Sequence, residues 1–181
     1  MTDRSLVQIA FYAALIAVLG LVPKFDLGPV PVTAQSLGVM LAGVMLGPVR
    51  GALAVLLFLL VLALGAPVLS GGRGGFAWFY SASGGFLIGF PVAAFAAGFV
   101  MRITGRLNIL VSSALAAAIG GVLVLYAFGI PGMALLGNMT FGQAFSFALI
   151  FVPGDLIKVA LTAVIAQTIA RGLPSALVSR S

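Results

Sequence analysis

The chain has 181 residues, of which 62% are hydrophobic and 7% charged, and its mean hydropathy is +1.29. A soluble domain carries charge on about a quarter or more of its surface positions, so a soluble fold is excluded. Histidine and cysteine are both absent, and we expect no catalytic imidazole or thiol, no disulfide, no metal and no cofactor. The net charge of +6 comes from singly scattered basic residues, without the stripe that nucleic-acid binding needs. The composition predicts an all-α integral membrane protein.

Uncharged apolar runs predict six transmembrane helices in a single domain that covers residues 1–181. The predicted helices cover residues 6–22, 34–46, 51–64, 84–101, 109–128 and 142–171. The fifth is expected to end at Phe128 because Gly129, Pro131 and Gly132 follow it. The second and third are short for a full span, so they must be covered by protein or tilted.

The distribution of Lys and Arg predicts that both termini lie in the cytoplasm. In this topology Lys24 and Arg73 lie outside, whereas six arginines lie inside. These six are Arg4, Arg50, Arg102, Arg106, Arg171 and Arg180. The first apolar stretch ends at Pro23 without a small-residue cleavage pattern, so we interpret it as a retained span.

Residues 65–83 form a long connection with five glycines and an aromatic cluster of Phe76, Trp78, Phe79 and Tyr80. Long connections are usually functional, although an aromatic belt at the membrane interface explains the cluster equally well. The topology places this segment outside, and we expect Ser70 to be accessible there.

Asp155 and Lys158 are the only charged residues inside a predicted span. Charge at membrane depth is costly and indicates a functional site by default. Residues three apart on a helix lie one turn apart, so the two side chains can pair or converge on one ligand. They lie about 24 and 20 Å from Arg171, in the outer half of the membrane. A buried ion pair that locks the last helix is the structural alternative.

The same outer half receives Thr33, Gln35 and Arg73 from the connections between helices. An acid, two bases, neutral polar groups and flat apolar walls suit a small ligand with a polar ring and an ionised tail. Taken singly, Gln35 is equally well explained as a helix cap and Arg73 as a solvated loop charge.

Enzymatic activity is not expected. The phosphate-binding G-x-x-x-x-G-K-[ST] pattern is absent, and an intramembrane aspartyl enzyme needs two converging carboxylates where this chain buries only Asp155. An intramembrane serine protease would have Lys158 as its sole candidate base.

Small residues four apart mark the faces on which membrane helices pack. The first helix contains Ala10 with Ala14 and Ala13 with Ala17. Internal packing and docking of another subunit explain this spacing equally well.

Four ordered segments resemble the BioY family, whose members are biotin-binding S components of energy-coupling factor (ECF) transporters. They are residues 29–38 (PVPVTAQSLG), 46–52 (LGPVRGA), 84–90 (GGFLIGF) and 153–158 (PGDLIK). The resemblance implies a six-helix bundle with both termini inside, in the bacterial cytoplasmic (inner) membrane, and a biotin site that faces outward. Before the double glycine many members read Gly-Pro-Thr, whereas Ser81, Ala82 and Ser83 stand here.

The resemblance also implies which residues bind biotin and which meet partners. Its Asp and Lys map onto Asp155 and Lys158, and its Thr-x-Gln maps onto Thr33 and Gln35. Arg73, Tyr80 and Ser83 are further candidates for ligand contact. Ala10 and Ala14 would meet a coupling membrane subunit, which acts with two ATP-hydrolysing ABC subunits. A homo-oligomer that works alone is the alternative.

Biotin suits the expected pocket, because its ureido ring needs donors and acceptors, its thioether ring needs apolar walls and its carboxylate needs a cation. An S component for thiamine or riboflavin, a homo-oligomeric pore or exporter, and an intramembrane enzyme are the competing interpretations.

Overall fold

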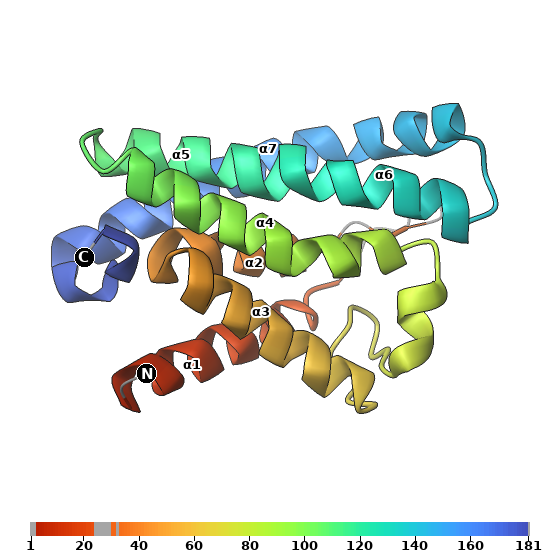
Figure 1. Cartoon of the computed structure of the whole chain (residues 1–181), viewed down its shortest axis with the longest axis horizontal. Helices are drawn as coiled ribbons and strands as arrows, with labels where there is room; N and C mark the ends of the chain where they lie inside the picture. The colour runs from red at the N-terminus through yellow and green to blue at the C-terminus, as the bar shows by residue number, and fades with distance from the viewer. Residues whose placement is uncertain (1–2, 24–29, 32, 181) are drawn as a thin grey trace.

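The structure is a computed structural model that describes residues 3–23, 30–31 and 33–180, and these residues form a bundle of helices (Figure 1). Within these ranges the only strand-like feature is an isolated bridge between Leu69 and Arg73. Lys24, Asp26, Pro29 and Val32, on which parts of the sequence analysis rest, lie outside the described residues.

A helix overlaps each of the six predicted ranges. The bounds are α1 (Asp3–Leu19), α2 (Gln35–Leu46), α3 (Pro48–Ala63), α4 (Gly84–Ile103), α5 (Ile109–Ala118), the π-helical η2 (Ile119–Val124), α6 (Leu125–Leu136) and α7 (Phe141–Gly172). Short 3-10 helices are η1 (Phe76–Tyr80), η3 (Pro174–Ala176) and η4 (Val178–Arg180). By length and composition, α4, the continuous helix Ile109–Leu136 and α7 can each cross a membrane.

The prediction that the fifth helix ends at Phe128 is wrong, because this helix continues to Leu136. Pro131 lacks the N–H that would bond one turn back, and the helix continues with one hydrogen bond fewer. Gly132 mediates a close contact with α4: a Cβ added there would lie 2.4 Å from the Cα of Gly85. These residues therefore serve helix packing, which the sequence pattern alone did not distinguish from a chain break.

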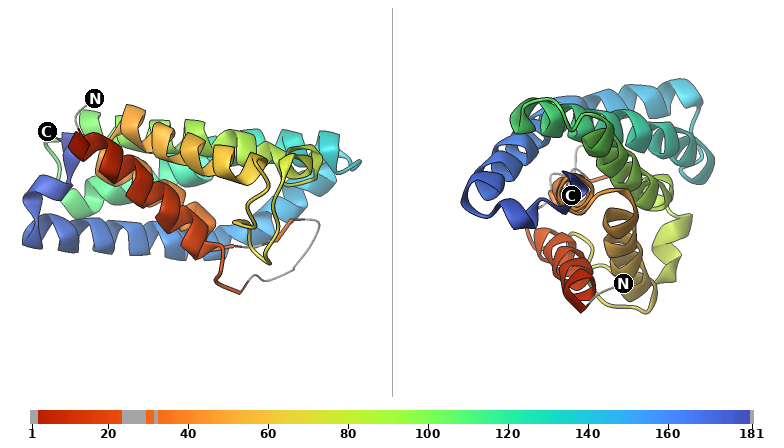
Figure 2. Two further views of the ribbon diagram at one scale, coloured as in Figure 1. Left: turned by 90° about the horizontal axis from the view of Figure 1, so that it is seen from below. Right: turned by 60° about the vertical axis from the view of Figure 1, so that its left-hand side comes forward.

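The short helix α2 is the centre of the bundle (Figure 2). It packs against α1, α3, α4, α5 and α7, and Leu37 is its only residue that is not buried. Of the two alternatives for a helix too short to span a membrane, cover by protein or tilt, the burial of α2 shows cover by protein.

The connection 65–83 folds back onto the start of α2. The backbone N–H of Ser70 donates to Oε1 of Gln35 at 3.4 Å, and the Ser70 hydroxyl donates to the carbonyl of Val22 at 3.4 Å. Ser70 is 1% exposed, so the expectation that it is accessible is wrong. Other parts of the connection are exposed, among them Gly71 and Gly72, and Phe76 and Tyr80 of η1.

Candidate functional site

A cavity opens among the start of α2, the connection 69–73, the first turns of α4, the start of α6 and the middle of α7. Its volume is about 660 Å³ when the part that is continuous with solvent is included. It is lined by Val30, Pro31, Thr33, Gln35, Ser36, Leu69, Ser70, Arg73, Ser83, Phe86, Leu87, Phe90, Leu125, Tyr126, Phe151, Asp155 and Lys158.

Asp155 is the centre of a polar cluster in this cavity. Its Oδ1 accepts from Nζ of Lys158 at 2.7 Å, and its Oδ2 accepts from the hydroxyl of Tyr126 at 2.5 Å. The Lys158 ammonium also donates to the hydroxyl of Ser36 at 2.9 Å. Asp155 is 4% exposed, so its charge is compensated by these contacts and not by water.

Two members of this cluster, Tyr126 and Ser36, were missed by the sequence analysis. Tyr126 follows the π-helical turn η2 directly, at the second position of α6. A π turn adds one residue to the helical repeat and so changes which side chains face the bundle interior. The only sequence signal for Tyr126 is a single phenol inside a long apolar run. Ser36 adjoins Gln35, and its contact with Lys158 spans 122 positions of sequence.

The amide of Gln35 is bonded to backbone groups rather than left open to the cavity. Its Nε2 donates to the carbonyl of Val68 at 2.9 Å and to that of Ile16 at 3.3 Å. Its Oε1 accepts from Ser70, as described above. The N-cap position of α2 is Ala34, so Gln35 is not the helix cap. Gln35 instead fastens the connection and the end of α1 to the start of α2, and thereby shapes one wall.

Arg73, near the middle of the connection, and Ser83, at its end, line the same cavity. The Nε of Arg73 donates to the carbonyl of Ser70 at 2.8 Å, and its guanidinium carbon lies 4.3 Å from the ring centroid of Trp78. Near Ser83, the Ser81 hydroxyl donates to the carbonyl of Trp78 at 2.7 Å and lies 2.9 Å from the Ser83 hydroxyl. Side-chain hydrogen bonds thus hold the turn formed by residues 81–83.

Aromatic rings form flat apolar walls around the polar cluster. The ring of Phe86 meets those of Tyr126 and Phe151 edge to face, with centroid separations of 6.3 and 6.1 Å. Phe90 and Leu125 extend the apolar lining. One polar centre inside apolar walls is the arrangement that orients a small ligand with a polar ring.

Tyr80 is the one ligand candidate that the structure does not bring into the cavity. It is 68% exposed, and its ring packs against Phe76 at a centroid separation of 5.7 Å. Thr33, Gln35, Arg73, Ser83, Asp155 and Lys158 all line the cavity. Within the described ranges no group of three acidic residues is placed to hold a metal ion.

The two alanine pairs of α1 lie on different faces. Ala13 is 7% exposed and faces the core, where Ala17 also packs. Ala10 and Ala14 are exposed. No segment of the described residues covers this face of α1.

Comparison with known proteins gives the same family from sequence and from structure. The family model described as "BioY family" matches residues 1–175. "Biotin transporter BioY" of Rhizobium etli is 49% identical, covering 96% of this chain and 97% of the relative. "Biotin transporter BioY" of Rhodobacter capsulatus is 44% identical, with coverage of 98% and 99%. A crystal structure titled as the S-component for biotin from an ECF-type ABC transporter superposes with a TM-score of 0.88 at 32% identity, covering 94% of this chain and 95% of that one.

Proposed function

Because the chain belongs to the BioY family, we propose that it is the biotin-binding membrane subunit, or S component, of an ECF-type ABC transporter for biotin uptake. It is a transport protein and not an enzyme. The observation that carries the proposal is the cluster of Asp155, Lys158 and Tyr126, which lines an apolar-walled cavity and in which Asp155 is buried.

The deep polar cluster is proposed to hold the ureido ring of biotin. The carboxylate of Asp155 accepts from ureido N–H groups, and Lys158 with Ser36 donates toward the ureido oxygen. The thioether ring packs against Phe86 and Phe90. The cluster supports this assignment because it contains a strong acceptor, the Asp155 carboxylate, and a strong donor, the Lys158 ammonium.

The valerate carboxylate is proposed to lie toward Arg73. A second carboxylate beside Asp155 would suffer like-charge repulsion in a site with little water, so the ionised tail must point away from it. Among the described residues Arg73 is the other cation that lines the cavity, and like Lys158 it is half-buried. Thr33 and Ser83 supply further hydroxyls, while Gln35 acts by positioning the connection.

The chain is proposed to be one domain of six spans with both termini in the cytoplasm. In support, both termini lie at the same end of the bundle (Figure 1), and four of its arginines are close to helix ends or turns at that end. These four are Arg4 near the start of α1, Arg50 in the first turn of α3, Arg102 in the last turn of α4 and Arg171 in the last turn of α7. An excess of Arg on one side indicates the cytoplasmic side of a bacterial inner membrane.

The proposed partners are a coupling membrane subunit and two ABC ATPase subunits. The exposed pair Ala10 and Ala14 on α1 is the proposed docking face, because small side chains let a second helix approach closely.

Equilibrium binding of radiolabelled biotin to the purified chain tests the proposal. We expect one biotin per chain, with binding that excess unlabelled biotin abolishes and excess thiamine or riboflavin leaves intact. Binding of thiamine or riboflavin in place of biotin would assign the cavity to another vitamin. Flux without saturable binding would indicate a pore.

A further inference from the structure

A second cavity lies at the opposite end of the bundle from the connection 65–83, between the start of α3 and the end of α4. Its volume is about 640 Å³, including the part that is continuous with solvent. Arg50 and Arg102 line it together with the apolar side chains of Pro48, Val49, Leu53 and Val178. The geometry points to a binding site for the phosphodiester headgroup of an anionic phospholipid at this end of the bundle.

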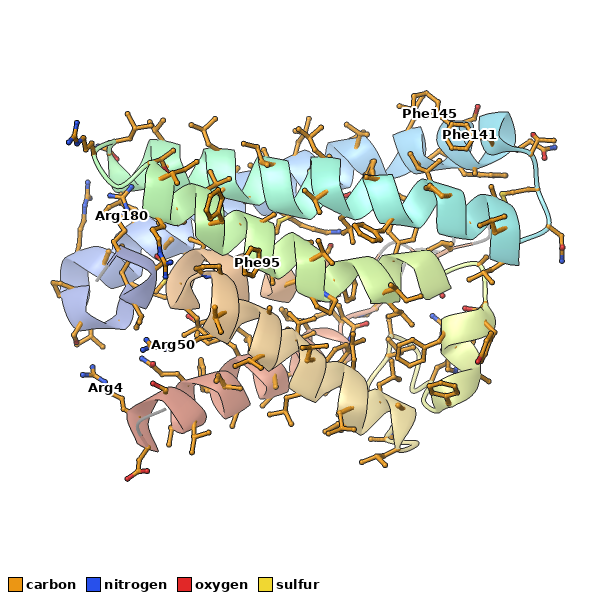
Figure 3. All side chains as sticks on the ribbon, in the orientation of Figure 1. Arg4, Arg50, Phe95, Phe141, Phe145 and Arg180 are labelled. Atoms are coloured by element: carbon orange, nitrogen blue, oxygen red, sulfur yellow. The ribbon has the colours of Figure 1, made fainter. Side chains whose placement is uncertain are left out.

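The charges of this cavity are uncompensated within the described residues. Among the described residues an ion pair joins Asp155 and Lys158, which lie far from this end of the bundle. Neither Arg50 nor Arg102 donates a hydrogen bond to a described residue. By contrast, Arg180 at the same end is engaged, since its guanidinium donates to the carbonyls of Leu107 and Thr104 at 3.1 and 3.3 Å. Figure 3 shows Arg4, Arg50 and Arg180 gathered at this end. Two guanidinium groups that line one cavity and have no partner among the described residues favour the binding of an anion.

The backbone adds to the same preference. Arg50 lies in the first turn of α3, which begins at Pro48. The first turn of a helix leaves N–H groups without intrahelical partners, and its positive dipole end favours a phosphate group. A phosphate in the cavity would therefore meet both side-chain and main-chain donors.

The apolar surface that continues from the cavity favours a lipid over a free phosphate. Val49, Leu56 and Leu60 are exposed on α3 at spacings of seven and four residues, so they share one face. Phe95 and Phe99 are exposed on α4. Arg102 lies three residues after Phe99, one helical turn further along the same face. Because α3 packs against α4, acyl chains can lie along these exposed faces while the headgroup meets the arginines. Basic pockets between spans bind anionic lipid headgroups in this manner.

Native mass spectrometry of the delipidated chain, titrated with phosphatidylglycerol or phosphatidylcholine, tests this site. We expect one tightly held phosphatidylglycerol per chain, bound at least tenfold more tightly than phosphatidylcholine. Arg50→Gln with Arg102→Gln should abolish this preference. Arg106→Gln with Arg171→Gln removes the same charge from exposed residues outside the cavity and should preserve it. Equal loss in both double variants would overturn the site, because it would indicate a general surface charge effect.

Two further measurements separate the lipid from other ligands and from misfolding. Val49→Trp keeps both arginines but fills the mouth of the cavity, and should lower phosphatidylglycerol affinity at least tenfold, whereas Leu60→Trp on the same face should not. All variants should still bind biotin, since the vitamin cavity lies elsewhere. Displacement of the lipid by equimolar glycerol 3-phosphate would assign the cavity to a free phosphate. Unchanged lipid binding in the arginine variant, with loss of a copurifying subunit, would assign it to protein carboxylates. Either result would contradict the lipid site.

Discussion

The hydroxyl of Tyr126 donates to Asp155 across the interface between α6 and α7, at 2.5 Å. This contact occupies the carboxylate oxygen that Lys158 leaves free, so the two oxygens of Asp155 have different partners. A ligand that bonds to Asp155 must share or replace one of them. The affinity of the site for biotin should therefore depend on Tyr126, although this residue carries no charge.

Tyr126→Phe should weaken biotin binding by about tenfold or more. The substitution removes one charge-assisted hydrogen bond, which contributes about 1.5–3 kcal/mol, and it keeps the ring that packs on Phe86. Titration calorimetry measures the change. Tyr80→Phe removes the same hydroxyl from an exposed ring outside the cavity and should leave the affinity unchanged. If the two variants bind alike, Tyr126 has no part in the site.

Gly85→Ala and Gly132→Ala should each destabilise the protein. A Cβ at residue 85 would lie 2.6 Å from the Cα of Gly132, so α4 and α6 must separate. Overpacking of this kind costs about 1–3 kcal/mol, which is measured as a lower midpoint of thermal unfolding. Gly142→Ala is the control, because its added Cβ meets nothing within 4 Å and should not lower the midpoint. Equal midpoints for all three variants would contradict the proposed contact.

Ala10→Trp and Ala14→Trp should preserve biotin binding and reduce uptake. Both residues are exposed on α1, so bulk there holds another helix away without filling the bundle. Ala13→Trp, on the buried face, should instead unfold the protein and abolish both activities. Binding and uptake are measured in parallel on cells that also contain the coupling and ATPase subunits. Unchanged uptake in the two exposed variants would leave α1 without a docking role.

The proposed topology predicts which engineered cysteines react from outside the cell. Ala77→Cys lies in the exposed η1 segment and should react with a membrane-impermeant thiol reagent in intact cells. Ser175→Cys lies after α7, is also exposed, and should react only after the cells are opened. The native chain has no cysteine, so no background labelling competes. The reverse pattern would invert the topology.

Helices and the charged pair were predictable because each leaves a strong local signal. Apolar runs predict helices over six ranges, and Asp155 and Lys158 stand out as charges inside one of them. The extension of α6 past Gly129 was not predictable, since glycine and proline break helices in water yet serve close packing here. Tyr126 was missed because its role arises from a π-helical turn and a contact across 29 positions of sequence. Ser70 was misjudged because its burial depends on the fold of the whole connection.

Asp155 and Lys158 either bind the ligand or only hold α7 in place, and substitutions distinguish these two roles. If the pair only locks α7 in place, Lys158→Met leaves an uncompensated charge and loses several kcal/mol, whereas adding Asp155→Asn removes that charge and restores the protein. If both groups bond to biotin, the double variant loses two strong hydrogen bonds to the ligand. Its affinity should then fall by about 100-fold or more.

The most direct test is therefore the biotin dissociation constant of Asp155→Asn, Lys158→Met and the double variant, measured by titration on folded protein. Thermal unfolding identifies the folded fraction of each variant. We predict that the double variant folds but binds biotin at least 100-fold more weakly than the parent chain. A double variant that binds biotin as tightly as the parent would contradict the assignment of the site.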